Sequence, residues 1–194
     1  VTLSNLQRQI LHATDSAGTA KTDSASCRLK ALNPAVEITT ATERLTPDNA
    51  LALLEKCDLA VDASDNYAAR FALADACAAL RIPLVHGAVK GFIGQATVFA
   101  PHEGTACYRC LFPEETPMQE EDTASAAGIL GAHAGIIGCI QALEALKALA
   151  GIPSPLRGGL LSADTLRMRF TVIPLHPSPT CKCRNGGGGG AAMR

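Results

Sequence analysis

The chain has 194 residues, enough to bury one substantial hydrophobic core and most simply organised as a single domain. Its 17 basic and 18 acidic residues give a net charge of −1, and neither sign forms a long run. A nucleic-acid-binding or anionic-membrane protein needs a basic face, so this balance argues against both classes. The hydrophobic fraction of 47% is ordinary for a globular domain, although the chain is rich in alanine and has no tryptophan.

The first residues show no signal peptide, because they lead into polar sequence without a basic start or an apolar run. No methionine precedes Val1, so we expect the start to be missing or trimmed. The most apolar segment, residues 124–140, contains His133 and falls short of the roughly 20 apolar residues that a membrane span requires. Four of the eight cysteines stand singly, and the others form two close pairs typical of a metal site in a reducing compartment. We therefore expect a cytoplasmic protein.

Helices and strands alternate in the first half of the chain. Asn33-Pro34 ends one helix, because the residue before a proline disfavours helical geometry. Thr46-Pro47-Asp48 has the residue types of a helix start. The predicted helices lie at 6–11 (a short turn), 20–32, 46–57 and 66–80, and the predicted strands at 36–39 and 59–61.

The second half begins with two strands. The glycines between them allow the two strands to pair as a hairpin. It ends with a long helix and a second hairpin. The predicted strands lie at 83–89, 95–99, 158–164 and 168–173, the helix at 128–150, and an exposed crossing loop at 111–121. Strand–helix alternation followed by hairpins predicts an α/β fold, whose mixed sheet is parallel first and antiparallel at the far edge, with helices on both faces.

The long helix contains glycines at 128, 131, 135 and 138. Each costs about 1 kcal/mol relative to alanine if the helix is continuous. Close approach of another backbone usually offsets such a cost, either from a neighbouring helix or across a dimer. Core packing within one chain is the alternative interpretation.

Charged side chains follow in an order that this fold could gather at one place. Asp62 and Asp65 come directly after a buried strand, and an open α/β sheet binds ligands beyond the carboxyl ends of its strands. Asp62 could simply cap the turn, whereas Asp65 is better placed to reach a cation. Lys21 lies near a helix start, where its charge and the helix dipole attract phosphate, and Asn5 and Arg8 precede it by a short loop. This chemistry fits a nucleoside triphosphate with Mg²⁺; the alternative for each charge is a solvated surface residue.

Four motifs stand in a definite order: S-N-L-Q-R-Q at 4–9, Lys21, D-A-S-D-N at 62–66 and C-Y-R-C at 107–110. With them the chain resembles the ThiF/MoeB/HesA family, the bacterial relatives of ubiquitin-activating enzymes. The resemblance runs from Val1 to about Cys183. It implies a Rossmann-like adenylyltransferase domain at residues 1–184 and leaves a flexible glycine-rich tail at 185–194.

The resemblance further implies an ATP-dependent adenylyltransferase. Such an enzyme joins the C-terminal carboxylate of a ubiquitin-like sulfur carrier to AMP and releases pyrophosphate, in molybdopterin or thiamine biosynthesis. By position, Arg8 would bear on the triphosphate, Lys21 on the phosphates near the reacting centre, and Asp65 would hold Mg²⁺. The residues lining the nucleotide site would include Ser4, Asn5, Gln9 and Asn66. We expect a homodimer; the alternative function is a catalytically incomplete, carrier-binding or dimerisation module.

The paired cysteines would form a structural zinc site in such a protein. Cys107 and Cys110 would supply one half, and Cys181 and Cys183 the other. The family usually places two residues between the later cysteines, whereas this chain has one. A turn would bring both sulfurs onto one tetrahedral ion and clamp the last hairpin to the loop after Phe99. Loss of the site and disulfide pairing are the alternatives.

Two departures from the family pattern affect the expected chemistry. The glycine-rich phosphate loop and an acidic residue after the second strand would precede Val1, so the sequence is a fragment or the protein does not bind ATP in the usual way. Residues 111–127 contain no cysteine, which predicts no covalent thioester or persulfide step on this chain. The five histidines have no obvious nucleophile partner, and we interpret them as structural or surface residues. A dinucleotide-dependent oxidoreductase would need a G-x-G-x-x-G motif, which the chain lacks.

Overall fold

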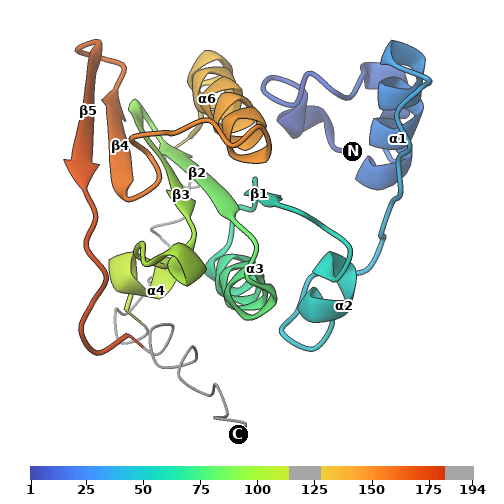
Figure 1. The fold of residues 1–194 in the computed structure, drawn as a ribbon. Helices are drawn as coiled ribbons and strands as arrows, with labels where there is room; N and C mark the ends of the chain where they lie inside the picture. The colour runs from blue at the N-terminus through green and yellow to red at the C-terminus, as the bar shows by residue number, and fades with distance from the viewer. Residues whose placement is uncertain (114–127, 182–194) are drawn as a thin grey trace, which may run out of the picture.

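The structure is a computed structural model that describes residues 1–113 and 128–181. A five-stranded sheet in the order β1-β2-β3-β4-β5 forms its centre (Figure 1). The strands are β1 (Ala60–Asp62), β2 (Leu84–Lys90), β3 (Ile93–Phe99), β4 (Gly159–Asp164) and β5 (Arg169–Pro174). β1 runs parallel to β2, and the remaining pairs are antiparallel. The predicted fold class, parallel first and antiparallel at the far edge, is confirmed.

Helices cover both faces of this sheet, with α6 on one face and α3 and α4 on the other (Figure 1). Strand residues alternate between the two faces, so neighbouring positions enter different cores. Leu84 packs with Tyr108 on the α3 side, whereas Val85 packs with Ile140 on the α6 side. The helices are α1 (Lys21–Leu32), α2 (Ala50–Leu54), α3 (Tyr67–Leu80), α4 (Tyr108–Leu111) and α6 (Gly131–Leu149).

Helix α3 begins at a side-chain cap that fixes the turn before it. The Asn66 side-chain oxygen accepts the backbone N–H of Ala69 at 2.9 Å. The helix ends at Arg81, which adopts a left-handed conformation with φ of 58°. Its alanines at 72, 74 and 76 are buried, because small side chains let the helix pack closely. The structure matches the helix predicted at 66–80.

Helix α6 crosses β2 and β3 and buries His133, Ile137, Gln141 and Glu144, which lie on one helical face. A Cβ added at Gly131 would collide with the backbone oxygen of Gln7. Of the four glycines predicted to allow close backbone approach, Gly131 therefore does so within the described residues. Cβ atoms at positions 135 and 138 would meet nothing within 4 Å, and residue 128 precedes the helix.

The structure differs from the prediction at three places before β1. Residues 36–39 form no strand, and Val36 is 52% exposed. No described strand lies beside them, and an isolated strand leaves its backbone groups unpaired. The first 3₁₀ turn spans Leu3–Asn5, earlier than the turn predicted at 6–11. The helix expected from 46 begins at Ala50, because Asn49 accepts the N–H of Thr46 at 2.8 Å within a preceding turn.

None of the helices in the described ranges combines the length and apolar content needed to cross a bilayer. The tail predicted at 185–194 lies outside the described residues, as does most of the crossing loop predicted at 111–121.

Candidate functional site

A cavity of about 370 Å³ lies past the end of β1, beside β2 and α6. Its wall includes three cationic side chains, Arg8, Lys21 and Arg70, and the carboxylate of Asp65. Guanidinium and ammonium groups suit phosphate oxygens, and a carboxylate suits a divalent cation. The cavity therefore has the groups needed to hold a polyphosphate together with a metal ion.

The structure brings four of the predicted site residues into this one cavity: Arg8, Gln9, Lys21 and Asp65. Lys21 is the first residue of α1, so its position at a helix start agrees with the expectation. Asp65 lies in the turn between β1 and α3 and is exposed to solvent. Segments that are far apart in sequence thus supply the charges of a single site.

The other predicted nucleotide-site residues do not line the cavity but contact residues that do. Asn5 accepts a hydrogen bond from Arg8 Nη2 at 3.1 Å, and the backbone oxygen of Ser4 accepts from Arg8 Nη1 at 3.4 Å. Asn66 caps α3, and its amide lies 3.5 Å from Asp65 Oδ1. Ser4 and Asn5 therefore position Arg8, and Asn66 positions Asp65.

The N-terminal segment is fastened to the start of α6, which places Arg8 over the cavity. Gln7 Nε2 donates to the backbone oxygen of Ile129 at 3.2 Å. The same segment approaches Gly131 so closely that no side chain fits there. Residue 129 in turn bridges to Gly91 at the β2–β3 turn. The position of Arg8 therefore depends on the absence of a side chain at the first residue of α6.

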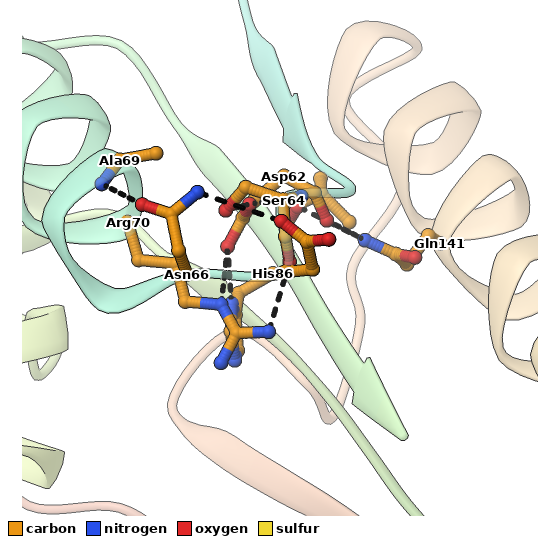
Figure 2. A network of polar contacts seen from close by, with 9 residues as sticks. Asp62, Ser64, Asn66, Ala69, Arg70, His86 and Gln141 are labelled. Carbon is orange, nitrogen blue, oxygen red and sulfur yellow. Dashed lines mark hydrogen bonds and ion pairs between the residues drawn. The ribbon is translucent and has the colours of Figure 1, made fainter. Parts of the chain in front are cut away.

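Beside the cavity, Asp62 anchors a buried polar network (Figure 2). Its Oδ1 accepts the N–H of Ser64 at 2.9 Å and the hydroxyl of Ser64 at 2.6 Å, so it caps the turn as one sequence interpretation held. Its Oδ2 lies 2.7 Å from Nδ1 of His86. Burial raises the pKa of Asp62, but the attraction and hydrogen bond of His86 and the bonds from Ser64 outweigh it, so that this pKa lies below its usual value.

Three residues of this region were not predicted as site residues. Arg70 lines the cavity and donates to the backbone oxygen of Ser64 at 2.9 Å. Gln141 reaches from α6 to the backbone oxygen of Asp62 at 2.7 Å. His86, interpreted as structural, is fully buried against Asp62. A polar residue within an apolar strand or helix was the available signal for His86 and Gln141.

A second cluster lies away from the cavity, where Cys107, Cys110 and Cys181 place their sulfurs within 4.8 Å of one another. The Sγ of Cys107 is 3.7 Å from that of Cys110 and 3.2 Å from that of Cys181. These separations exceed a disulfide bond of about 2.05 Å and are close to the spacing of thiolates on one tetrahedral zinc ion with bonds of about 2.3 Å. The three described thiols therefore fit a zinc ion. Cys183 lies outside the described residues.

A comparison against known families identifies the family of the chain. A model described as the ThiF family matches residues 1–185. The chain belongs to the ThiF family. The expected resemblance is thereby confirmed.

Curated relatives of this ThiF-family chain include two named adenylyltransferases. The sulfur carrier protein adenylyltransferase of Thermus thermophilus is 42% identical, over 93% of this chain and 68% of its own length. The adenylyltransferase and sulfurtransferase MOCS3-2 of Zea mays is also 42% identical, over 93% of this chain. The chain spans only 38% of the length of that relative.

Solved structures share the fold of this ThiF-family chain at low sequence identity. The crystal structure of E. coli MccB with ATP superposes with a TM-score of 0.79. The match covers 95% of this chain and 57% of MccB, at 16% identity. At this identity the likeness supports the fold.

Proposed function

We propose that this protein transfers the adenylyl group of ATP to the C-terminal carboxylate of a ubiquitin-like sulfur-carrier protein. In this reaction a carboxylate oxygen attacks the α-phosphorus, an acyl–phosphate bond forms, and the bond to the β-phosphate oxygen breaks as pyrophosphate leaves. The observation that carries the proposal is the convergence of Arg8, Lys21 and Asp65 on one cavity. The name of the Thermus relative supports the choice of acceptor.

The side chains of the cavity have distinct parts in the proposed reaction. Arg8, with Asn5 holding its guanidinium, would bind the triphosphate. Lys21 would neutralise charge near the reacting phosphorus, where positioning and charge neutralisation supply most of the catalysis. Asp65 would hold Mg²⁺, whose charge stabilises the departing pyrophosphate. Arg70 adds a third cation to the same wall.

Exchange of labelled pyrophosphate into ATP, measured with the full-length gene product and a carrier, tests this function. Carriers of molybdopterin and of thiamine biosynthesis are the two acceptors to compare. D65A should lower exchange by about 10² to 10³, the usual effect of losing one group that stabilises transition-state charge. E55A removes an exposed carboxylate that directly follows α2 and does not line the cavity, so it should retain exchange. Exchange that persists in D65A would remove Asp65 from the mechanism, and no exchange in the wild type would favour the non-catalytic binding module.

We propose that Cys107, Cys110, Cys181 and Cys183 hold one structural Zn²⁺. The clustering of three of their sulfurs supports this site. Ser178 donates its backbone N–H to Cys110 Sγ at 3.3 Å, an outer contact that suits a thiolate. The ion would join the segment after β5 to α4. Metal analysis should find about one zinc per chain in the wild type and a loss in C107S, whereas C57S, at an exposed cysteine outside the cluster, should keep it.

We further propose that the protein is a homodimer that buries the outward face of α6. Three leucines on this face, at 143, 146 and 149, are 55%, 66% and 60% exposed, and Ile136 is 37% exposed. Side chains three and seven residues apart share a helical face, so they form one apolar strip. Light scattering after gel filtration should give twice the chain mass for the wild type and the monomer mass for L143E/L146E. The substitution K30E, on exposed α1, is the control and should leave the mass unchanged.

The exposed thiols support a proposal for the protein's location. Cys27, Cys57 and Cys139 are exposed and form no disulfide, which suits a reducing compartment. We propose the cytoplasm, and fractionation of cells expressing the tagged protein would test it.

A further inference from the structure

The third residue of β2 is a histidine in a strand whose neighbours are apolar. His86 is 0% exposed, and aromatic rings surround its imidazole. The ring centroids of Tyr108, Phe99 and Phe112 lie 5.3, 6.0 and 6.5 Å away. Burying a polar ring costs free energy unless its nitrogens are hydrogen-bonded, so the contact that His86 makes must offset this cost.

That contact joins β1 and β2, which run parallel to each other. Asp62 and His86 are register partners of β1 and β2, and His86 Nδ1 lies 2.7 Å from Asp62 Oδ2. An ionised carboxylate only accepts hydrogen bonds, so the imidazole donates from Nδ1. Asp62 is 1% exposed, and this bond helps keep its carboxylate charged inside the protein.

The carboxylate of Asp62 in turn shapes the turn that carries Asp65. Asp62 binds both the N–H and the hydroxyl of Ser64, and Arg70 binds the backbone oxygen of Ser64 (Figure 2). Asn66 is fixed as the cap of α3. Asp65 thus stands between two anchored residues, and within the described residues its side chain is approached by the Asn66 amide at 3.5 Å. Its direction toward the cavity is set by the turn.

We propose that His86 is a positioning residue of the nucleotide site, which acts through Asp62 and Ser64 to aim Asp65 and Arg70 into the cavity. The inference rests on the proposed function for the role of Asp65. Without the imidazole, the nearest remaining charge to Asp62 Oδ2 is Arg70, whose Nε lies 3.9 Å away. Arg70 would then move toward Asp62, release the backbone oxygen of Ser64 and withdraw from the cavity wall.

Three variants separate positioning from stability. H86L introduces an apolar side chain of similar size and removes the donor. H86N keeps an N–H donor that can occupy the place of Nδ1. T97V is the control, because Thr97 is the register partner of His86 on β3, is buried, and donates only to backbone oxygens of Leu156 and Gly159 outside the cavity.

Two measurements are made on each full-length variant. The first is the Mg²⁺ concentration that gives half-maximal ATP–pyrophosphate exchange. H86L should raise it about tenfold or more, as loss of an outer partner of a metal ligand does, and H86N should stay within about threefold of wild type. T97V should lower the melting temperature and leave the Mg²⁺ dependence unchanged. An unchanged Mg²⁺ dependence in H86L would overturn the inference.

The second measurement is amide hydrogen exchange of the protein without nucleotide, which needs no activity. H86L should accelerate exchange at Ser64 and Asp65 and leave the middle of α3 protected, whereas T97V should not change the turn. If the wild type has no pyrophosphate exchange, the proposed function fails, and protection of the turn still decides whether His86 orders it. Equal protection of the turn in H86L and wild type would refute the positioning role.

Discussion

Gln141 of α6 lies against Gly87 of β2, and the contact leaves no room for a side chain on the strand. Gln141 Nε2 donates to the backbone oxygen of Asp62 at 2.7 Å and approaches that of Val85 at 3.4 Å. A Cβ added at Gly87 would overlap the Gln141 amide. One buried side chain thus connects the helix to both parallel strands at the edge of the cavity.

The first prediction concerns this contact. G87A should destabilise the protein by about 1–3 kcal/mol, because the methyl group forces Gln141 from its place in a packed site. Q141A should also destabilise it through loss of its hydrogen bonds. The double variant should be less destabilised than the sum of the two, because removal of the amide makes room for the methyl group. Urea unfolding measures all three free energies, and strictly additive values would contradict the contact.

The second prediction concerns Asp62 and pH. In the folded protein the pKa of Asp62 lies below the ordinary value of about 3.9. The charge of Asp62 therefore stabilises the fold above about pH 3.9, and this stabilisation is lost as the pH falls through the folded pKa. D62N replaces the charged acceptor of His86 and Ser64 by a neutral amide and should lower the free energy of unfolding at pH 7 by about 1–3 kcal/mol.

Urea unfolding of wild type and D62N between pH 3 and 7 measures the difference. The difference in free energy of unfolding between wild type and D62N should be constant from pH 7 to about pH 5. It should become smaller below about pH 4, where the wild-type carboxylate becomes protonated in the unfolded chain. D164N is the control, since Asp164 also has a lowered pKa, from Arg167, but lies on the surface and should have little effect. A difference in unfolding free energy that grows as the pH falls would contradict the lowered pKa of Asp62.

The third prediction tests how α6 places Arg8. G131A should displace the N-terminal segment, because the added methyl group collides with the backbone of Gln7. G135A lies one turn further along the same helix, where its methyl group meets nothing within 4 Å. We expect G131A to weaken ATP binding about tenfold, as a misplaced phosphate contact does, and G135A to bind as wild type. Calorimetric titration with ATP and Mg²⁺ distinguishes them, and equal affinities would show that Arg8 does not need this approach.

The sequence predicted those parts of the fold whose signals are local. The helix predicted at 66–80 matches α3, and the glycines between apolar runs indicated the β2–β3 hairpin. Residues 36–39 have the composition of a strand and form none, because pairing depends on a neighbour that local sequence does not specify.

In the candidate site, the sequence predicted only the residues that belong to its motifs. Arg8, Lys21 and Asp65 were found because their residue types and order indicate anion and cation binding. Gln141 was missed, because its role depends on the register of α6 against two strands, over 50 residues away in sequence. His86 was interpreted as structural, and its link to the site appears only when β1 and β2 are paired.

The last prediction is the order in which thiols react. Cys27 and Cys57 are exposed and lie outside the α6 face proposed to be buried in the dimer, so they should react first with a water-soluble disulfide reagent at pH 8. Burial raises the pKa of the Cys77 thiol to about 12, with the charges of Cys57 and Asp62 adding to the shift. At pH 8 only about one part in ten thousand of Cys77 is then thiolate, so it should react only on unfolding.

The clustered cysteines should fall between these two groups. A bound zinc ion would protect Cys107, Cys110 and Cys181, which should become reactive when a chelator removes the metal. Removal should also lower the melting temperature, because Cys107 and Cys181 are 74 residues apart and the ion closes that loop. Mass spectrometry of the labelled peptides assigns each site. Labelling of the cluster as fast as Cys57, without chelator and in metal-replete protein, would mean that these thiols hold no metal.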